Sequence, residues 1–112
     1  MNSRELLKGT LSTIVLKLLS EKEKMYGYEM YQQVKELSSG KILLKDGSLY
    51  PALQKMTNDG LLAFKEEVVG GRVRKYYYLT KKGHKQKTAY VEELRDFLGT
   101  LNKIVFPETK LA

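Results

Sequence analysis

The stretch from Lys45 to Leu62 constrains the fold more than any other part of this chain, because it predicts one short helix with two different sides. Ser48 is suited to cap the start of this helix, and Gly60 is suited to end it. Between them, apolar residues recur at intervals of four and three, which is the spacing of one helix face. These residues are Leu49, Leu53 and Met56.

The other side of this helix contains no acid and presents hydrogen-bonding groups. Its members are Ser48, Pro51, Gln54, Lys55 and Asn58. Pro51 is expected in the first turn, where the missing N–H of a proline does no harm. A three-turn helix with one neutral-to-basic side is suited to the major groove of DNA. On this stretch alone, an ordinary surface helix is an equal alternative.

The positive charge of the chain is concentrated in its middle. With 112 residues the chain has the size of one domain, and its formal net charge is +7. Residues 1–40 have a net charge of +1, residues 41–88 have +7 and residues 89–112 have −1. A concentrated positive field favours a polyanion, because each neutralised phosphate releases counterions. A basic surface that only keeps the protein in solution is the alternative.

The composition gives little support to several classes of function. The chain has no cysteine, so it lacks thiolate metal ligands, and we expect a reducing, cytoplasmic setting. No apolar run reaches the roughly 20 residues that a membrane span needs, and no signal-peptide pattern is expected. The single histidine, His84, lies among lysines without a catalytic partner. We therefore expect no enzyme, metal site, cofactor or membrane partner.

A core-packing helix is predicted near the start of the chain, beginning at about Ser3. Its apolar positions are Leu7, Leu11, Ile14, Val15, Leu18 and Leu19. A second helix opens at residues 25–30 and ends at residues 38–40. The costly glycine in it, Gly27, indicates that another helix or backbone packs closely there. Residues 41–45 are too few for a helix and predict a small strand.

Two tyrosines at the start of the second helix have two interpretations. Tyr26 and Tyr28 are suited to helix packing, and they are also suited to a phosphate contact through the hydroxyl.

Two extended runs, residues 61–69 and 72–79, are joined by Gly70-Gly71, which is a strong hairpin signal. Basic side chains cluster just past this turn and give the hairpin a positively charged tip. They are Arg72, Arg74 and Lys75. Such a tip is suited to phosphate or minor-groove contact. The alternative is an edge strand whose charge prevents aggregation.

The last predicted helix has an apolar seam that a domain of this size does not cover. Thr80 is suited to cap the helix, and Pro107 ends it. From residue 81 to residue 105 it would be about 36 Å long. The seam consists of Tyr90, Leu94, Phe97, Leu101 and Ile104, with Val91, Leu98 and Val105 alongside. An uncovered seam predicts a homodimer with two-fold symmetry, and a helix folded back on its own core is the alternative.

The order helix, helix, short strand, helix and hairpin is that of a winged helix-turn-helix, so we expect a mainly α fold with a small β wing. Four motifs within this order resemble those of the PadR family of transcriptional regulators. They are Tyr26-Gly27-Tyr28-Glu29, Gly47-Ser48-Leu49-Tyr50-Pro51-Ala52-Leu53, Asp59-Gly60-Leu61-Leu62, and Arg72-x-Arg74-Lys75-Tyr76-Tyr77 with Leu79-Thr80-x-x-Gly83. The resemblance covers residues 10–85.

The resemblance implies a bacterial homodimeric regulator, usually a repressor, that binds double-stranded DNA and is often relieved by a small aromatic or hydrophobic effector. Residues 1–80 would form the winged helix-turn-helix DNA-binding domain. Residues 81–112 would form a C-terminal dimerisation helix and a short tail, as in the smaller subfamily. Met56 stands where leucine is commoner in the family. The chain has no tryptophan, so the ligand site between tryptophans of some relatives does not carry over.

We expect the candidate residues to divide between DNA and a second protomer. Pro51, Gln54 and Lys55 would face base edges, with Gln54 suited to adenine and Lys55 to guanine. Phosphate contacts are expected from Ser48, Tyr50, Arg72, Arg74 and Lys75. Dimer contacts are expected from Tyr90, Leu94, Phe97, Leu98, Leu101 and Ile104. A winged helix that binds only protein or RNA is the alternative, and it predicts no steep salt dependence of duplex binding.

Overall fold

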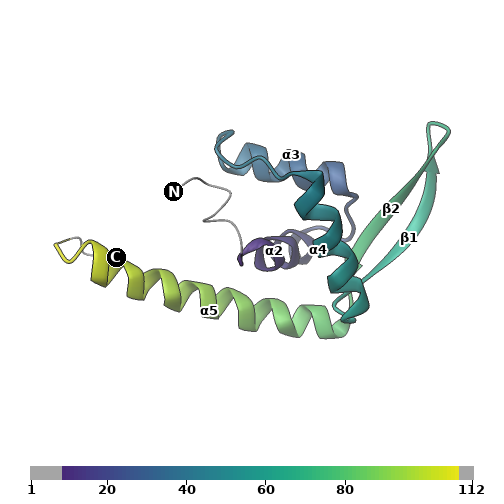
Figure 1. The fold of residues 1–112 in the computed structure, drawn as a ribbon. Helices are drawn as coiled ribbons and strands as arrows, with labels where there is room; N and C mark the ends of the chain where they lie inside the picture. The colour runs from purple at the N-terminus through teal and green to yellow at the C-terminus, as the bar shows by residue number, and fades with distance from the viewer. Residues whose placement is uncertain (1–8, 109–112) are drawn as a thin grey trace.

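The computed structural model describes residues 9–108, which form four helices and one two-stranded antiparallel sheet (Figure 1). The elements are α2 (Leu11–Glu21), α3 (Gly27–Leu37), α4 (Asp46–Asn58), β1 (Leu62–Val69), β2 (Arg72–Leu79) and α5 (Lys81–Val105). The sheet is a hairpin that projects from the helical body as a wing. This is the mainly α, winged helix-turn-helix fold that the order of elements predicts.

Residues 9–10 form a turn where the sequence predicts helix. Gly9 has a φ of +97°, so a turn precedes α2, which starts at Leu11. The prediction of one helix running on from Ser3 is therefore wrong at residues 9–10, and Ser3 and Leu7 themselves lie outside the described residues. The predicted apolar stripe omits Leu16, which is fully buried. Three elements, α4, α5 and β2, pack on α2, so more than one side of this helix is covered.

Gly27 allows α4 to pack closely on the start of α3. A Cβ atom at Gly27 would lie 2.5 Å from the hydroxyl oxygen of Tyr50 in α4, so a side chain fits there only if Tyr50 moves. The expectation that a close neighbour explains this glycine is confirmed.

The strand predicted at residues 41–45 is wrong, since this segment is an irregular connection. Its hydrogen bonds go to the end of α3, where the Ile42 N–H donates to the Ser38 hydroxyl at 2.9 Å, and Leu44 is buried in the core. The edge of the hairpin is occupied by Met25 instead. The N–H groups of Met25 and Tyr77 each donate to the carbonyl of the other residue, at 3.1 and 2.9 Å.

The central helix begins two residues earlier than Ser48. Its N-cap is Lys45, so Ser48 lies in the first turn and Pro51 lies further inside the helix than predicted. The Lys45 carbonyl accepts hydrogen bonds from the N–H groups of Ser48 and Leu49, at 3.0 and 2.8 Å. The first turn is therefore already closed where Ser48 was expected to cap it.

Gly60 ends α4 as predicted, with a φ of +78° that favours glycine. The Gly60 N–H donates to the Thr57 carbonyl and the Leu61 N–H donates to the Met56 carbonyl, at 3.0 and 2.9 Å. This pair of bonds is a Schellman motif, which satisfies carbonyls at the end of a helix.

The hairpin forms as its glycines predict. Gly70 and Gly71 have φ values of +57° and +78°, and a tight hairpin turn of the type that matches strand twist needs both to be positive. The register pairs Val69 with Arg72 next to the turn and Leu62 with Leu79 at the base of the wing.

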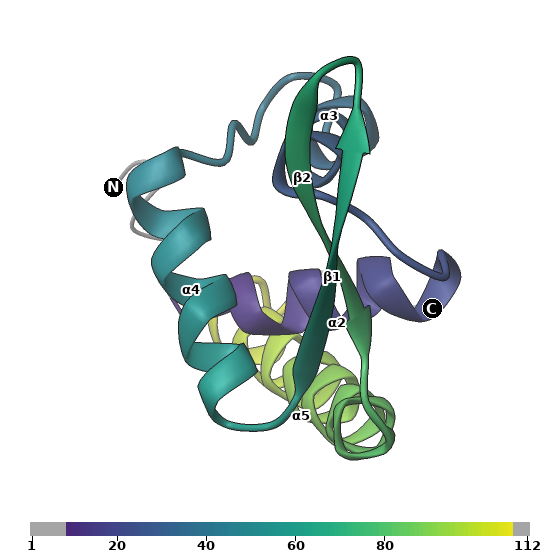
Figure 2. The same ribbon diagram turned by 90° about the vertical axis from the view of Figure 1, so that its right-hand side faces the viewer.

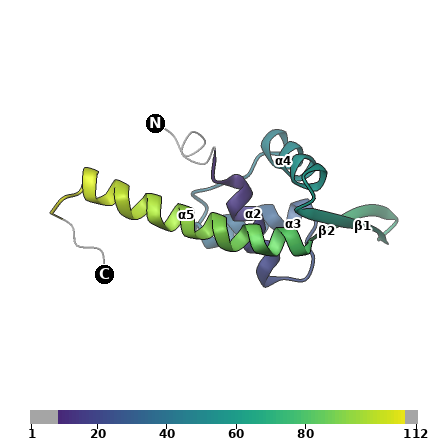
Figure 3. The same ribbon diagram turned by 90° about the horizontal axis from the view of Figure 1, so that it is seen from below.

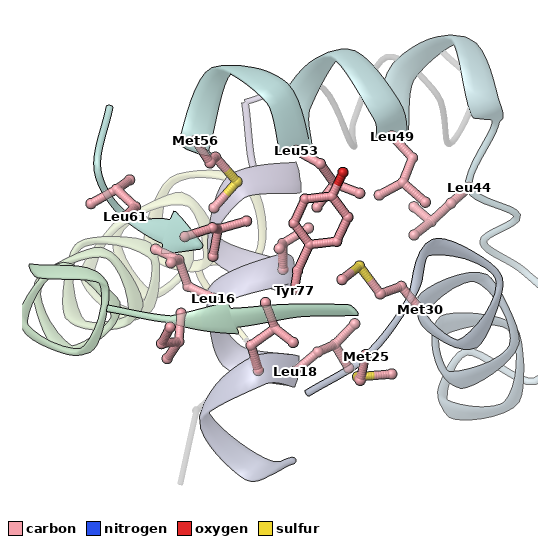
Figure 4. Packing of buried hydrophobic residues seen from close by; sticks show 14 of the residues in the cluster. Leu16, Leu18, Met25, Met30, Leu44, Leu49, Leu53, Met56, Leu61 and Tyr77 are labelled. Carbon is pink, nitrogen blue, oxygen red and sulfur yellow. The ribbon is translucent and has the colours of Figure 1, made fainter. Parts of the chain in front are cut away.

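The core lies between α2, α3, α4 and the base of the hairpin (Figure 4). Tyr77 extends from β2 into this core, and burial raises the pKa of its hydroxyl. The core residues are Val15, Leu16, Leu18, Leu19, Met25, Met30, Val34, Leu44, Leu49, Leu53, Met56, Leu61, Leu62, Tyr77 and Leu79.

α5 leaves the body in the direction opposite to the wing (Figures 1 and 3). Thr80 caps this helix as predicted, because its Oγ1 accepts a hydrogen bond from the Gly83 N–H at 3.0 Å. α5 packs against α2, and its far end extends past the body, so the molecule measures 55 Å along its longest axis and 29 and 22 Å across it.

Replacing Gly83 by alanine is expected to lower the free energy of unfolding by about 1–3 kcal/mol. The new Cβ would lie 2.1 Å from the carbonyl oxygen of Leu61, and backbone cannot move aside as a flexible side chain would. This clash outweighs the roughly 1 kcal/mol by which alanine favours a helix over glycine. Denaturant unfolding measures the change. Gly47→Ala is the control, since a Cβ there meets nothing within 4 Å and should cost no stability.

Candidate nucleic-acid interface

The side of α4 that faces away from the core is open to solvent, and Figure 2 shows this helix standing beside the hairpin. Leu49, Leu53 and Met56 are at most 2% exposed and hold the helix on the core. All residues predicted for the opposite side are exposed: Ser48, Pro51, Gln54, Lys55 and Asn58. The helix therefore presents its hydrogen-bonding side outward.

The two predicted base-reading side chains bond to neighbours one turn along the same helix. Gln54 Nε2 donates to Asn58 Oδ1 at 3.0 Å, and Lys55 Nζ donates to Asp59 Oδ2 at 2.9 Å. The hydrogen bond and the charge of Asp59 raise the pKa of Lys55. Both pairs are exposed, so they contribute little to stability and are readily exchanged for another partner.

The three basic residues of the wing are held in different ways. Arg72 is exposed beside the turn. Arg74 is half-buried, and its guanidinium lies 4.4 Å from the centre of the Tyr26 ring. Lys75 places its ammonium 4.6 Å from the centre of the Phe64 ring. In the predicted basic tip, Arg72 and Lys75 are thus exposed and Arg74 is half-buried, and the charges of Arg74 and Lys75 rest on aromatic rings.

A hollow of about 570 Å³ lies between the start of α3, α4 and the hairpin. It brings together half of the predicted DNA-contact residues: Tyr50, Gln54, Arg74 and Lys75. The other half lies outside its lining: Ser48, Pro51, Lys55 and Arg72. The predicted contacts therefore form one surface in which a hollow is flanked by the outer side of α4 and the tip of the wing.

The lining of this hollow also contains an acid that sequence reasoning missed. Glu66 is the cross-strand partner of Lys75, which also lines the hollow. The sequence could have revealed this, because the register of the hairpin follows from the position of its glycine turn. Tyr26 also lines the hollow, and its ring supports Arg74. This role differs from both helix packing and phosphate contact, which are the two interpretations that the sequence suggested.

The apolar seam of α5 is covered only in its first part. Tyr90 and Leu94 are half-buried, whereas Phe97 and Leu98 are 56% and 55% exposed, and Ile104 is 70% exposed. An apolar groove of about 410 Å³ opens between α2, α3 and the first part of this seam. Its lining includes Ile14, Leu18, Val34, Leu37, Val91 and Leu94.

Within residues 9–108, no group of three or more His, Cys, Asp or Glu side chains is arranged to hold a metal ion. His84 is exposed near the start of α5. The same part of the chain contains no helix that is both long and apolar enough to cross a membrane.

An outward-facing helix beside a basic hairpin, both on a small helical body, defines the class of winged helix-turn-helix regulators. The model of the transcriptional regulator PadR-like family matches residues 15–89, which is more than half of the chain. The chain therefore belongs to the PadR-like family of transcriptional regulators, as its motifs predict. The family and its structural neighbours regulate transcription and are not enzymes, and membership implies DNA binding.

Solved structures and sequence relatives agree with this assignment. A transcriptional regulator from Clostridium thermocellum is 27% identical, with a TM-score of 0.83 over 90% of this chain and 98% of that one. A PadR-like transcription factor from Bacteroides fragilis is 32% identical, with a TM-score of 0.72 over 91% of this chain and 96% of that one. Transcriptional regulator Rv3488 of Mycobacterium tuberculosis is 37% identical over 68 residues, which are 57% of this chain and 64% of that protein.

Replacing Asp59 by asparagine is expected to tighten binding of random-sequence duplex DNA about two- to fivefold at moderate salt. The change removes the anion that pairs with Lys55 and that repels phosphate. Fluorescence anisotropy with a labelled duplex measures the affinity. Glu92→Gln on α5 is the control, because it changes the net charge of the protein by the same amount as Asp59→Asn. Glu92 pairs with Arg95 of the same helix and not with a candidate DNA-contact residue. An equal gain from both variants would show that net charge alone matters.

Proposed function

We propose that this chain is a sequence-specific DNA-binding repressor that acts as a homodimer and is relieved by a small hydrophobic or aromatic ligand. The observation that carries the proposal is the exposed, hydrogen-bonding side of α4 next to the basic wing. Such a helix is suited to the major groove while the wing contacts the backbone or the minor groove.

In this proposal α4 reads the sequence. Gln54 exchanges its bond with Asn58 for the N6 and N7 edge of an adenine, and Lys55 exchanges Asp59 for the O6 and N7 edge of a guanine. Pro51 faces the base edges beside them. Phosphates are contacted by Ser48, Tyr50, Arg72, Arg74 and Lys75, which fix the position of the helix.

Dimerisation is supported by the exposed apolar residues at the far end of α5. Two copies of this seam, including Tyr90, Leu94, Phe97, Leu98, Leu101 and Ile104, cover each other about a two-fold axis. Residues 1–80 then act as the reading unit and residues 81–112 as the dimerisation unit. Two-fold symmetry places the paired half-sites about one helical turn of DNA apart.

Relief by a ligand is supported by the open apolar groove between α2, α3 and α5. It lies against the first part of the proposed dimer seam, at Val91 and Leu94. A compound that binds there is in contact with both the body and the dimerisation helix. Repression is the usual role in the family that the motifs indicate.

Replacing Gln54 and Lys55 by alanine is expected to reduce discrimination between operator and random DNA by about 1–3 kcal/mol for each lost base contact. Arg72→Gln is the contrasting variant, because loss of a phosphate contact weakens both kinds of DNA alike and flattens the salt dependence. Binding of fragments from upstream of the gene, against random duplex at several salt concentrations, measures both. No binding by the unchanged protein at low salt would favour a role in protein or RNA contact.

Replacing Leu101 and Ile104 by glutamate is expected to give a monomer in sedimentation experiments, because the charges would enter an apolar interface. These residues are better probes than the half-buried Leu94, which also packs on its own body. Lys103→Glu places the same carboxylate on the polar side of the helix and should leave the dimer intact. A dimer that persists in the double variant would place the interface elsewhere.

A further inference from the structure

We propose that Tyr26 is a positioning residue that holds the Arg74 guanidinium in place for one DNA backbone phosphate. The inference rests on the proposed DNA binding and deepens it. The guanidinium carbon of Arg74 lies 4.4 Å from the centre of the Tyr26 ring, within the range of a cation–π contact. α3 thereby supports a charge that the hairpin carries.

The Tyr26 ring is itself fixed from two sides. The Tyr26 and Tyr76 rings are in a T-shaped contact, with 5.3 Å between centres and planes at 71°. The Tyr26 N–H donates to Glu29 Oε1 at 3.1 Å, which holds its backbone at the start of α3. The preceding residue, Met25, forms the backbone bridge to Tyr77. The Tyr26 ring under Arg74 is therefore held by contacts to both α3 and the wing.

Arg74 keeps its charge available because the acid opposite it on the neighbouring strand is engaged elsewhere. Glu67 is its cross-strand partner, but the Glu67 carboxylate pairs with Lys24. The hydrogen bond to Glu67 raises the pKa of Lys24, whose ammonium also lies 4.8 Å from the centre of the Tyr76 ring. Among residues 9–108, no ion pair neutralises Arg74. Its N–H donors are left for an outside anion.

The position of Arg74 indicates where that anion lies. Arg74 lines the hollow that it shares with Tyr50 and Gln54 of α4. A backbone phosphate in this hollow lies between the groove read by α4 and the groove reached by the wing. A guanidinium held over a ring loses little freedom when it binds, so Arg74 contributes more per charge than the exposed Arg72.

The test measures affinity for a random-sequence duplex at low salt, since a phosphate contact does not depend on sequence. Tyr26→Leu is expected to weaken binding about three- to tenfold, and Tyr26→Phe, which keeps the ring, is expected to bind as the unchanged protein does. In an Arg74→Gln background, Tyr26→Leu should cause no further loss. Tyr28→Leu is the matched control, because Tyr28 stacks on Tyr31 instead and its effect should add to that of Arg74→Gln.

A spectroscopic readout covers the case in which Tyr26→Leu fails to fold. The chain has no tryptophan, so Tyr26→Trp introduces a single tryptophan beneath Arg74, which can be excited selectively over the tyrosines. Tyr26→Trp alone should retain DNA binding, and its emission should change when Arg74→Gln is added. Three results would each overturn the inference about Tyr26 but not the proposed function. The affinity losses from Tyr26→Leu and Arg74→Gln could be additive, or Tyr26→Phe could weaken binding as much as Tyr26→Leu. The third is that the emission of Tyr26→Trp does not change when Arg74→Gln is added. No binding by the unchanged protein would overturn the proposed function as well.

Discussion

The close approach of α5 to the backbone at Leu61 fixes the directions of all the parts that matter for function. Gly83 packs against the Leu61 carbonyl, and the same oxygen accepts hydrogen bonds from the Thr80 N–H and hydroxyl, both at 3.1 Å. The Thr80 hydroxyl also donates to the Gly60 carbonyl at 2.6 Å. The end of α4, the first residue before β1, the end of β2 and the start of α5 therefore meet at one junction. The Gly83 contact and the Thr80 N–H bond join backbone to backbone, so no side-chain rearrangement relaxes these two.

Asp59 connects this junction to the reading side of α4. Its backbone carbonyl accepts a hydrogen bond from Lys82 Nζ of α5 at 2.7 Å, while its carboxylate pairs with Lys55. The outer side of α4 is thus satisfied by its own neighbours when no DNA is bound. DNA binding by the proposed mechanism is an exchange of partners on an exposed surface, so its net gain depends on how well a base edge competes with a side chain one turn away.

Local signals in the sequence were sufficient for most of the fold. Gly60, Gly70-Gly71 and Thr80 mark the end of α4, the wing turn and the start of α5, because each is decided by the conformation of a few neighbouring residues. The cap expected at Ser48 was wrong because the Lys45 carbonyl closes the turn first, which a list of favoured cap residues does not reveal. The strand expected at residues 41–45 was wrong for a different reason: the segment bonds to the end of α3 and buries Leu44 in the core.

The candidate site shows the same division between local and distant information. The exposed side of α4 follows from helical spacing alone, and the structure bears it out. The support of Arg74 by Tyr26 could not be predicted, since it joins the start of α3 to the wing and depends on the bridge between Met25 and Tyr77. Sequence could name the charged residues of the wing, but only the packing separates the exposed Arg72 from the half-buried Arg74.

The junction at Leu61 also determines how a ligand could relieve repression in the proposed dimer. Since α5 is one continuous helix whose Gly83 packs on the Leu61 carbonyl beside the end of α4, a tilt of α5 against its partner would also move the reading helix. A tilt of about 5° along a helix of about 36 Å moves its end by about 3 Å. That displacement is close to the rise of about 3.4 Å between successive base pairs of DNA. In the proposed dimer, a compound in the groove between α2, α3 and α5 would therefore need no contact with α4 or the wing, because a change of a few degrees at the seam would take the two reading helices out of register with their half-sites.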